Sequence, residues 1–162
     1  QEQEKRELEA RPKLVIGLDG IALGDKITDV IFKHPDFVQR DPQFVGNDAD
    51  AAYLSEKTHT EIGTNNKHVV TIFYYCNNND DKRVDKIACG DNVDKIFDAF
   101  GKDVRVQCFK DKNDPGNVSE RVYDAVRFGV RYLLTSDRVK GFIIAPPEEI
   151  ESWTGINWTA CE

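Results

Sequence analysis

Residues 68–76, HVVTIFYYC, carry the clearest secondary-structure pattern in the chain. β-branched and aromatic residues fill this stretch, and such residues favour a half-buried strand. The polar run that follows, NNNDD at 77–81, is typical of a solvated loop. We therefore predict a strand over 68–76 that ends in an exposed connection.

On the C-terminal side of this strand, helix and strand patterns alternate. A helix is predicted where apolar residues recur at helical spacing, at Val93, Ile96, Phe97 and Phe100. Gly101 stands where a C-cap glycine belongs, and residues 104–109 alternate as a strand does. Ser119 is a good N-cap for a long helix. The apolar face of that helix would hold Val122, Val126, Val130 and Leu133. GFIIA at 141–145 predicts a strand, and Pro147 starts a last short helix.

On the N-terminal side, the apolar run at 14–18 predicts a buried strand and the spacing at 25–33 a short helix. Residues 34–66 are the least periodic part of the chain, and they predict an irregular, function-bearing segment. No internal repeat is apparent. We expect a polar N-terminal tail over 1–12 and a single domain over 13–162.

This alternation predicts an α/β fold, a three-layer sandwich with a largely parallel sheet. The stretch DKNDPGN at 111–117 follows a strand, and RVKGFIIAPP occupies 138–147. On these residues, the region 69–150 resembles half of a doubly wound domain, as in periplasmic-type sugar-binding proteins. The resemblance implies a flavodoxin-like sheet or half of a periplasmic-binding-type domain. A thioredoxin-like fold is the alternative, because residues 69–76 look like the strand before a redox site, although Cys76-Asn77-Asn78-Asn79 lacks the second cysteine.

Composition excludes several classes of protein. The chain has 162 residues, with 22 Lys and Arg against 29 Asp and Glu, for a net charge of −7. An acidic chain lacks the basic stripe that a nucleic-acid partner requires. No apolar run is long enough to span a membrane. We expect neither nucleic acid nor a membrane span.

The cysteines and sequons point to an oxidising compartment. Cys76, Cys89, Cys108 and Cys161 are even in number, and four cysteines allow three pairings. We favour Cys76–Cys89, which closes a short polar loop, and Cys108–Cys161, which ties the C-terminal tail to a strand. Asn117 and Asn157 each begin a glycosylation sequon. The chain contains no Met and begins at Gln1, as signal removal would leave it. These features predict a secreted or extracellular glycoprotein.

No complete catalytic set is found. The sequence GLDGIAL at 17–23 looks like the haloacid-dehalogenase phosphatase motif, but Gly17 stands at the position of the nucleophile. Asp111 could open a calcium loop, but Val122 stands where an EF-hand requires Glu. We therefore predict no metal and no cofactor.

The sequence leaves three functions open. The favoured one is a non-catalytic interaction domain that binds a protein partner or itself, such as a subunit of an extracellular assembly. Its contact residues would be Tyr75, Trp153 and Trp158, since Trp and Tyr are enriched at interfaces. The first alternative is a small-ligand binder at the C-terminal ends of the sheet strands. Its ligand would lie among Asp19, Asn77, Asp111 and Pro146. The second alternative is a hydrolase with an unrecognised acidic site near Asp19 and Asp111.

Overall fold

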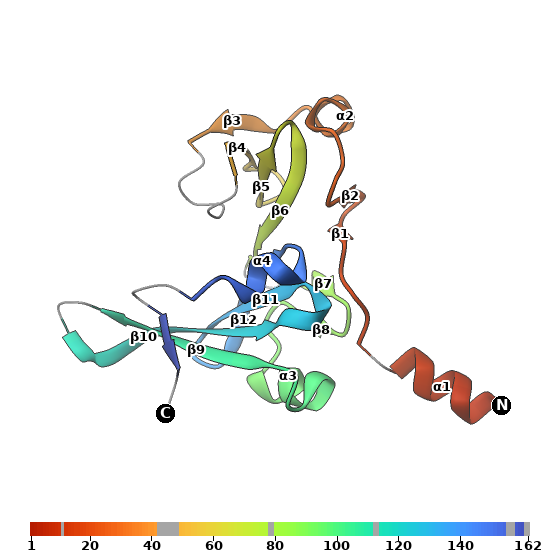
Figure 1. Cartoon of the computed structure of the whole chain (residues 1–162), viewed down its shortest axis with the longest axis vertical. Helices are drawn as coiled ribbons and strands as arrows, with labels where there is room; N and C mark the ends of the chain where they lie inside the picture. The colour runs from red at the N-terminus through yellow and green to blue at the C-terminus, as the bar shows by residue number, and fades with distance from the viewer. Residues whose placement is uncertain (11, 42–48, 78–79, 112–113, 155–157, 161–162) are drawn as a thin grey trace.

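Most of the chain forms one antiparallel sheet (Figure 1). The computed structural model describes residues 1–10, 12–41, 49–77, 80–111, 114–154 and 158–160, with side chains outside 7–10, 109–120 and 158–160. In spatial order, the nine strands are β13 (Trp158–Ala160), β9 (Arg105–Asp111), β10 (Asp114–Ala125), β11 (Val130–Thr135), β12 (Arg138–Ile144), β6 (His68–Tyr75), β5 (Thr60–Asn65), β4 (Ala51–Ser55) and β3 (Val38–Arg40).

The remaining elements are short. Two small hairpins pair β1 (Gly17–Leu18) with β2 (Ile21–Ala22) and β7 (Arg83–Val84) with β8 (Ile87–Ala88). The described helices are α1 (Glu2–Ala10), α2 (Ile27–Lys33), α3 (Val93–Phe100) and α4 (Pro147–Glu151), and a 3-10 turn spans Val126–Phe128. None of the described helices is both long and apolar enough to cross a bilayer.

The predicted fold class is wrong. Every pair of neighbouring strands in the large sheet is antiparallel, so the chain is not a three-layer α/β sandwich. It is neither flavodoxin-like nor half of a periplasmic-binding-type domain, and the thioredoxin-like alternative is unsupported. Tight turns set the strand direction. Asn66 and Lys67 join β5 to β6 with φ of 49° and 66°, and Ser136 and Asp137 join β11 to β12 with φ of 52° and 60°. Two-residue turns of this kind join antiparallel strands only.

The long helix predicted from Ser119 is the hairpin of β10 and β11 instead. Its evidence was apolar residues four positions apart, such as Val122, Val126 and Val130. Residues four apart share a face in a strand as well as in a helix. Gly129, in the left-handed region with φ of 73°, ends the 3-10 turn and reverses the chain.

The described part of the segment 34–66 is not irregular, because it supplies β3, β4 and β5. Sequence patterning missed these strands because β5, TEIGTN, is almost entirely buried although four of its six residues are polar. The helix predicted at 25–33 is observed at Ile27–Lys33, the helix predicted from Val93 to Phe100 is confirmed, and the strand predicted over 68–76 is observed at His68–Tyr75.

The chain contains an internal repeat, contrary to the sequence analysis. The first repeat runs β1-β2-α2-β3-β4-β5-β6 and the second runs β7-β8-α3-β9-β10-β11-β12. Their sheets meet at the antiparallel pair β6–β12, and strand order mirrors outward from it. The repeats are thus related as the halves of a symmetric dimer are. In sequence, DGIALGD at 19–25 matches DKIACGD at 85–91.

Matching hydrogen bonds hold each hairpin and helix against its own half of the sheet. The Asp25 carboxylate accepts the Ala22 amide at 2.9 Å, as Asp91 accepts Ala88 at 2.8 Å. The Gly24 amide donates to the Val69 carbonyl at 2.7 Å, and its counterpart in the second repeat donates to Val139 at 2.9 Å. Gly24-Asp25 and Gly90-Asp91 therefore play the same structural role, each in its own repeat.

We expect Gly24→Ala and Gly90→Ala to destabilise the fold by similar amounts. The two glycines have φ of +92° and +81°, and nothing lies within 4 Å of an added Cβ at either. The penalty is therefore backbone strain alone, about 1–2 kcal/mol for each variant. Urea denaturation of both variants measures it. If the two losses of stability differ by more than about 1 kcal/mol, the turns at Gly24 and Gly90 are not equivalent.

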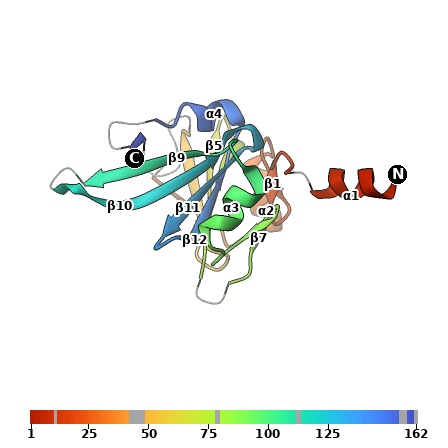
Figure 2. The same cartoon turned by 90° about the horizontal axis from the view of Figure 1, so that it is seen from below.

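The sheet has two unlike faces (Figure 2). Helices α2 and α3 cover one face, where the main core includes Val30, Ile62, Ile96 and Tyr132. Helix α4 lies on the opposite face. Helix α1 projects away from the sheet within the predicted tail 1–12 (Figure 1).

Candidate interaction surface

In the second repeat, buried charges line the sheet beneath α4. Asp124 on β10 is fully buried and accepts from Arg131 on β11, with Nε–Oδ1 at 2.6 Å and Nη2–Oδ2 at 3.0 Å. Arg105 on β9 donates to the same carboxylate, at 2.9 Å from Nη2. Two guanidinium groups therefore neutralise one carboxylate that has no access to water.

The same cations hold α4 in place. Arg105 Nη2 donates to the Ile150 carbonyl at 2.8 Å, and Arg131 Nη2 donates to the Trp153 carbonyl at 3.0 Å. The Trp153 ring stacks on the Arg131 guanidinium, 5.0 Å away. Helix carbonyls at a C-terminus lack partners within the helix, and cations satisfy them well. The chain's own residues 146–153 thus close this half of the face.

The sheet edge of the second repeat is also covered. Strand β13 pairs with β9, placing Thr159 opposite Cys108. In the first repeat, β3 holds the position of β9 and ends the sheet, with no further described strand beyond it. Helix α4 and strand β13, which cover the face and the edge of the second repeat, both follow β12 in the chain. The first repeat has no equivalent of either among the described elements.

In the first repeat, no described element covers the matching part of the face, and several of its side chains are exposed. We name it the open face and define it by Val38, Arg40, Leu54, Glu61 and Tyr75. Strand register assigns the equivalences. Glu61 pairs with Leu54 and Leu54 with Val38, as Arg131 pairs with Asp124 and Asp124 with Arg105. Val38 is 67% exposed and Tyr75 is 44% exposed.

A hollow of about 500 Å³ lies at the edge of the open face. Its lining comprises Asp36, Val38, Arg40, Leu54, Glu56 and Lys57. The lining thus combines two apolar side chains with four charged ones, a mixture that is typical of a surface that binds a partner. Phe73 and Tyr75 extend the apolar part, with ring centroids 4.1 Å apart.

Glu61 is the exceptional residue of the open face. It is 3% exposed, and its Oε2 lies 3.9 Å from Arg40 Nη1, beyond hydrogen-bond distance. Its buried Oε1 has no hydrogen-bond partner among the described residues. Burial raises the pKa of the Glu61 carboxyl, and the charge of Arg40 offsets this only in part. The first repeat therefore holds an under-satisfied acid where the second repeat holds a fully paired arginine.

We expect Glu61→Gln to stabilise the isolated protein by about 1 kcal/mol at pH 7, because it removes a buried charge with few partners. With its pKa raised, the folded state holds the Glu61 proton more tightly than the unfolded chain does. The penalty is therefore absent below the ordinary value of 4.5 and grows as pH rises above it. Chemical denaturation at pH 4 and pH 7 measures this, and an equal gain at both pH values would contradict it.

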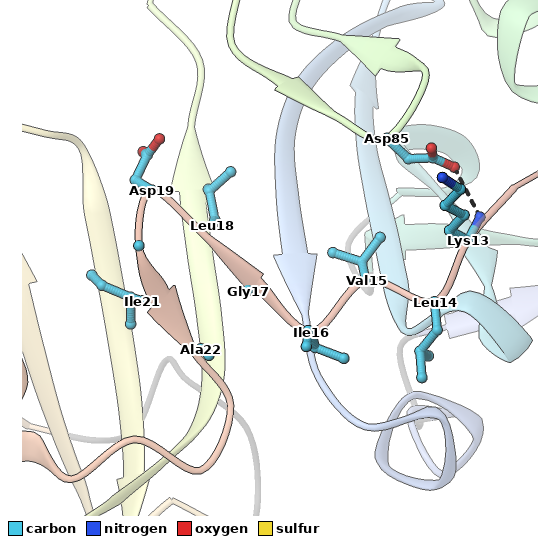
Figure 3. A pocket seen from close by; sticks show the side chains of 11 residues that line it. Lys13, Leu14, Val15, Ile16, Gly17, Leu18, Asp19, Ile21, Ala22 and Asp85 are labelled. Atoms are coloured by element: carbon cyan, nitrogen blue, oxygen red, sulfur yellow. Dashed lines mark hydrogen bonds between the residues drawn. The ribbon is translucent and has the colours of Figure 1, made fainter. Parts of the chain in front are cut away.

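A second hollow lies along the N-terminal strap, residues 13–22, and is shown in Figure 3. Its volume is about 510 Å³, and Asp85 completes the lining. Asp85 accepts the Lys13 amide at 3.2 Å at one end, and Asp19 lies at the other end, paired with Lys82 at 2.8 Å. Apolar side chains line the strap between them. The polar groups do not converge on a common point, so we assign no ligand to this hollow.

Two of the predicted ligand residues line different hollows. Asp19 lines the strap hollow, whereas Pro146 lines another of about 420 Å³ beside α4. The backbone amide of Asn77 donates to Asp80 Oδ2 at 3.3 Å. Asp111 is the last residue of β9. The expected crevice required strands with their carboxyl ends at one edge, and the antiparallel sheet does not provide this. Ligand binding by these residues stays a prediction. No cluster of three metal-binding side chains occurs in the described part of the chain.

Of the predicted interface residues, Tyr75 lies on the open face and Trp153 packs against Arg131. Trp158 lies in β13, where only the backbone is described. Their roles at an interface stay predictions.

Cys76 and Cys89 form a disulfide with Cα atoms 5.7 Å apart, the first of the two predicted pairs. The disulfide joins the residue after β6, at the end of the first repeat, to the residue after β8 in the second repeat. The second predicted pair involves Cys161, which lies outside the described residues, as does the sequon residue Asn157. Asn117 lies in β10, and its side chain is not described.

Comparison with known proteins gives a fold and no family. No protein-family model and no curated protein matches the sequence. A crystal structure of a cysteine-rich secretory protein from Staphylococcus aureus subsp. aureus Mu50 is similar, with a TM-score of 0.50 and 12% sequence identity. The similarity covers 95% of this chain and 54% of that one, so this chain spans about half the length of that structure. At this identity, the similarity shows a shared fold alone.

Proposed function

We propose that this protein is a secreted, disulfide-linked, non-catalytic domain that binds a segment of a partner protein on the open face. One observation carries the proposal. The chain covers the face and edge of its second repeat with its own residues 146–154 and 158–160, whereas no described element covers the same surface of its first repeat. A sheet face that is covered in one repeat and bare in the other is suited to a segment supplied from outside.

An extracellular location is supported by two further findings. The Cys76–Cys89 disulfide is typical of proteins in oxidising compartments. The similar crystal structure is that of a secretory protein. Occupancy of the sequons at Asn117 and Asn157 would agree with this location, and intact mass before and after deglycosylation measures it.

Binding at the open face is tested with a random linear peptide library displayed on phage and selected against the full chain. We expect selected peptides to lose binding to Val38→Asp, which puts a charge in place of an apolar side chain that lines the hollow. They should retain binding to Phe32→Asp, a matched control at a side chain that is 88% exposed on α2, on the other side of the sheet. Selected peptides that bind Val38→Asp as well as wild type would contradict the proposal.

A further inference from the structure

The open face differs from its covered counterpart chiefly in charge. In the second repeat the sheet supplies cationic donors, and the covering segment supplies carbonyl acceptors. In the first repeat the residue equivalent to Arg131 is Glu61, so the sheet supplies an acceptor instead. A segment that covers the first repeat must therefore bring a donor.

The contacts of Glu61 define what kind of donor is missing. A carboxylate can accept about four hydrogen bonds, whereas Arg40 reaches Oε2 only at 3.9 Å and the described residues give Oε1 none. Covering the face would remove the remaining water and make this deficit more costly. A neutral donor would satisfy one oxygen but leave the charge, whereas a cation supplies both the donor and the opposite charge.

The lining of the hollow is balanced in charge, and Glu61 together with the whole chain favours a cationic partner. The hollow is lined by two acids, Asp36 and Glu56, and two bases, Arg40 and Lys57, and Glu61 beside it adds a third acid. The chain as a whole carries a net charge of −7, which attracts a basic segment over distance.

Resting on the proposed function, we infer that the partner segment carries a lysine or arginine that inserts beside Leu54 and pairs with Glu61. The apolar residues on either side of this cation lie on Val38 and Tyr75. Arg40 lies at the edge of the hollow with its side chain 41% exposed, so it can move aside as the incoming cation enters. Glu61 is the specificity-determining residue of the surface.

The test uses three phage libraries of 12-residue peptides that differ only in a fixed central residue, which is Arg, Gln or Glu. Each library is selected against the wild-type chain and against Glu61→Gln, and clones are kept if Val38→Asp abolishes their binding. We expect the Arg-centred library to give affinities about tenfold or more above the Gln-centred one on wild type, as a charge-assisted hydrogen bond provides. On Glu61→Gln this advantage should fall below about twofold.

The outcomes separate the two claims. Clones that depend on Val38 but show no Arg preference, or that keep the preference on Glu61→Gln, overturn the inference and leave the proposed function standing. Enrichment of the Glu-centred library would also overturn it, since it would assign recognition to Arg40. If no library yields clones that depend on Val38, the proposed function fails and the inference fails with it. A thermal melt of Glu61→Gln confirms that the variant is folded.

Discussion

Replacing Asp124 with Asn is expected to lower the free energy of unfolding by about 3–5 kcal/mol, the largest effect of any single change considered. The carboxylate is fully buried and neutralises Arg131, whose side chain is 7% exposed, and Arg105. An amide keeps the shape but removes the charge, leaving the buried Arg131 guanidinium without its counter-ion. Guanidinium chloride denaturation, followed by circular dichroism, measures the loss.

The chain provides a matched control for this variant. Asp103 pairs with Arg127 at 3.4 Å, and both side chains are exposed. Asp103→Asn should change stability by less than about 0.5 kcal/mol, because water screens the exposed pair. If Asp124→Asn lost no more than its control, the buried network would not be what holds α4 on the sheet.

The second large effect is expected for Cys76→Ala combined with Cys89→Ala, which should lose about 3 kcal/mol. The disulfide closes a loop with a sequence separation of 13, and removing it restores conformational freedom to the unfolded chain. Replacing both cysteines avoids a reactive free thiol.

Denaturant titration distinguishes this mechanism from a packing defect. A loss that acts through a more expanded unfolded state comes with a steeper dependence of stability on denaturant. A loss without a change in that slope would instead point to the packing around Cys89. No change in stability would contradict the prediction outright.

The sequence was sufficient where one element carries several agreeing local signals. The helix at 93–100 has an apolar face, and Gly101 follows it directly. The strand at 68–75 is almost wholly β-branched or aromatic. The sequence misled where one pattern fits two structures, as in the spacing of Val122, Val126 and Val130. That error turned a hairpin into a crossover helix, and a crossover helix implies parallel strands.

The open face could be predicted only in part. Tyr75 was a candidate from its residue type alone. Glu61 lay in a segment without recognisable periodicity, so the sequence pattern offered no reason to place it on this face. One signal was available, the match between residues 19–25 and 85–91. When the two repeats are aligned on that match, with the tight turns at 66–67 and 136–137 in register, Glu61 aligns with Arg131. The alignment then shows that an acid in the first repeat replaces a base in the second.

The junction between β6 and β12 has a consequence for assembly. Each repeat on its own would end in a strand with a bare edge, and such an edge pairs readily with a second copy of itself. Two separate copies would form a dimer that falls apart on dilution. A single chain holds its two halves at an effective concentration in the millimolar range, so the pairing persists at any dilution. Fusion into one chain also allows the two halves to differ in sequence, because a symmetric dimer must carry the same residue at both equivalent sites. Only a fused chain can place arginine at one of them and glutamate at the other.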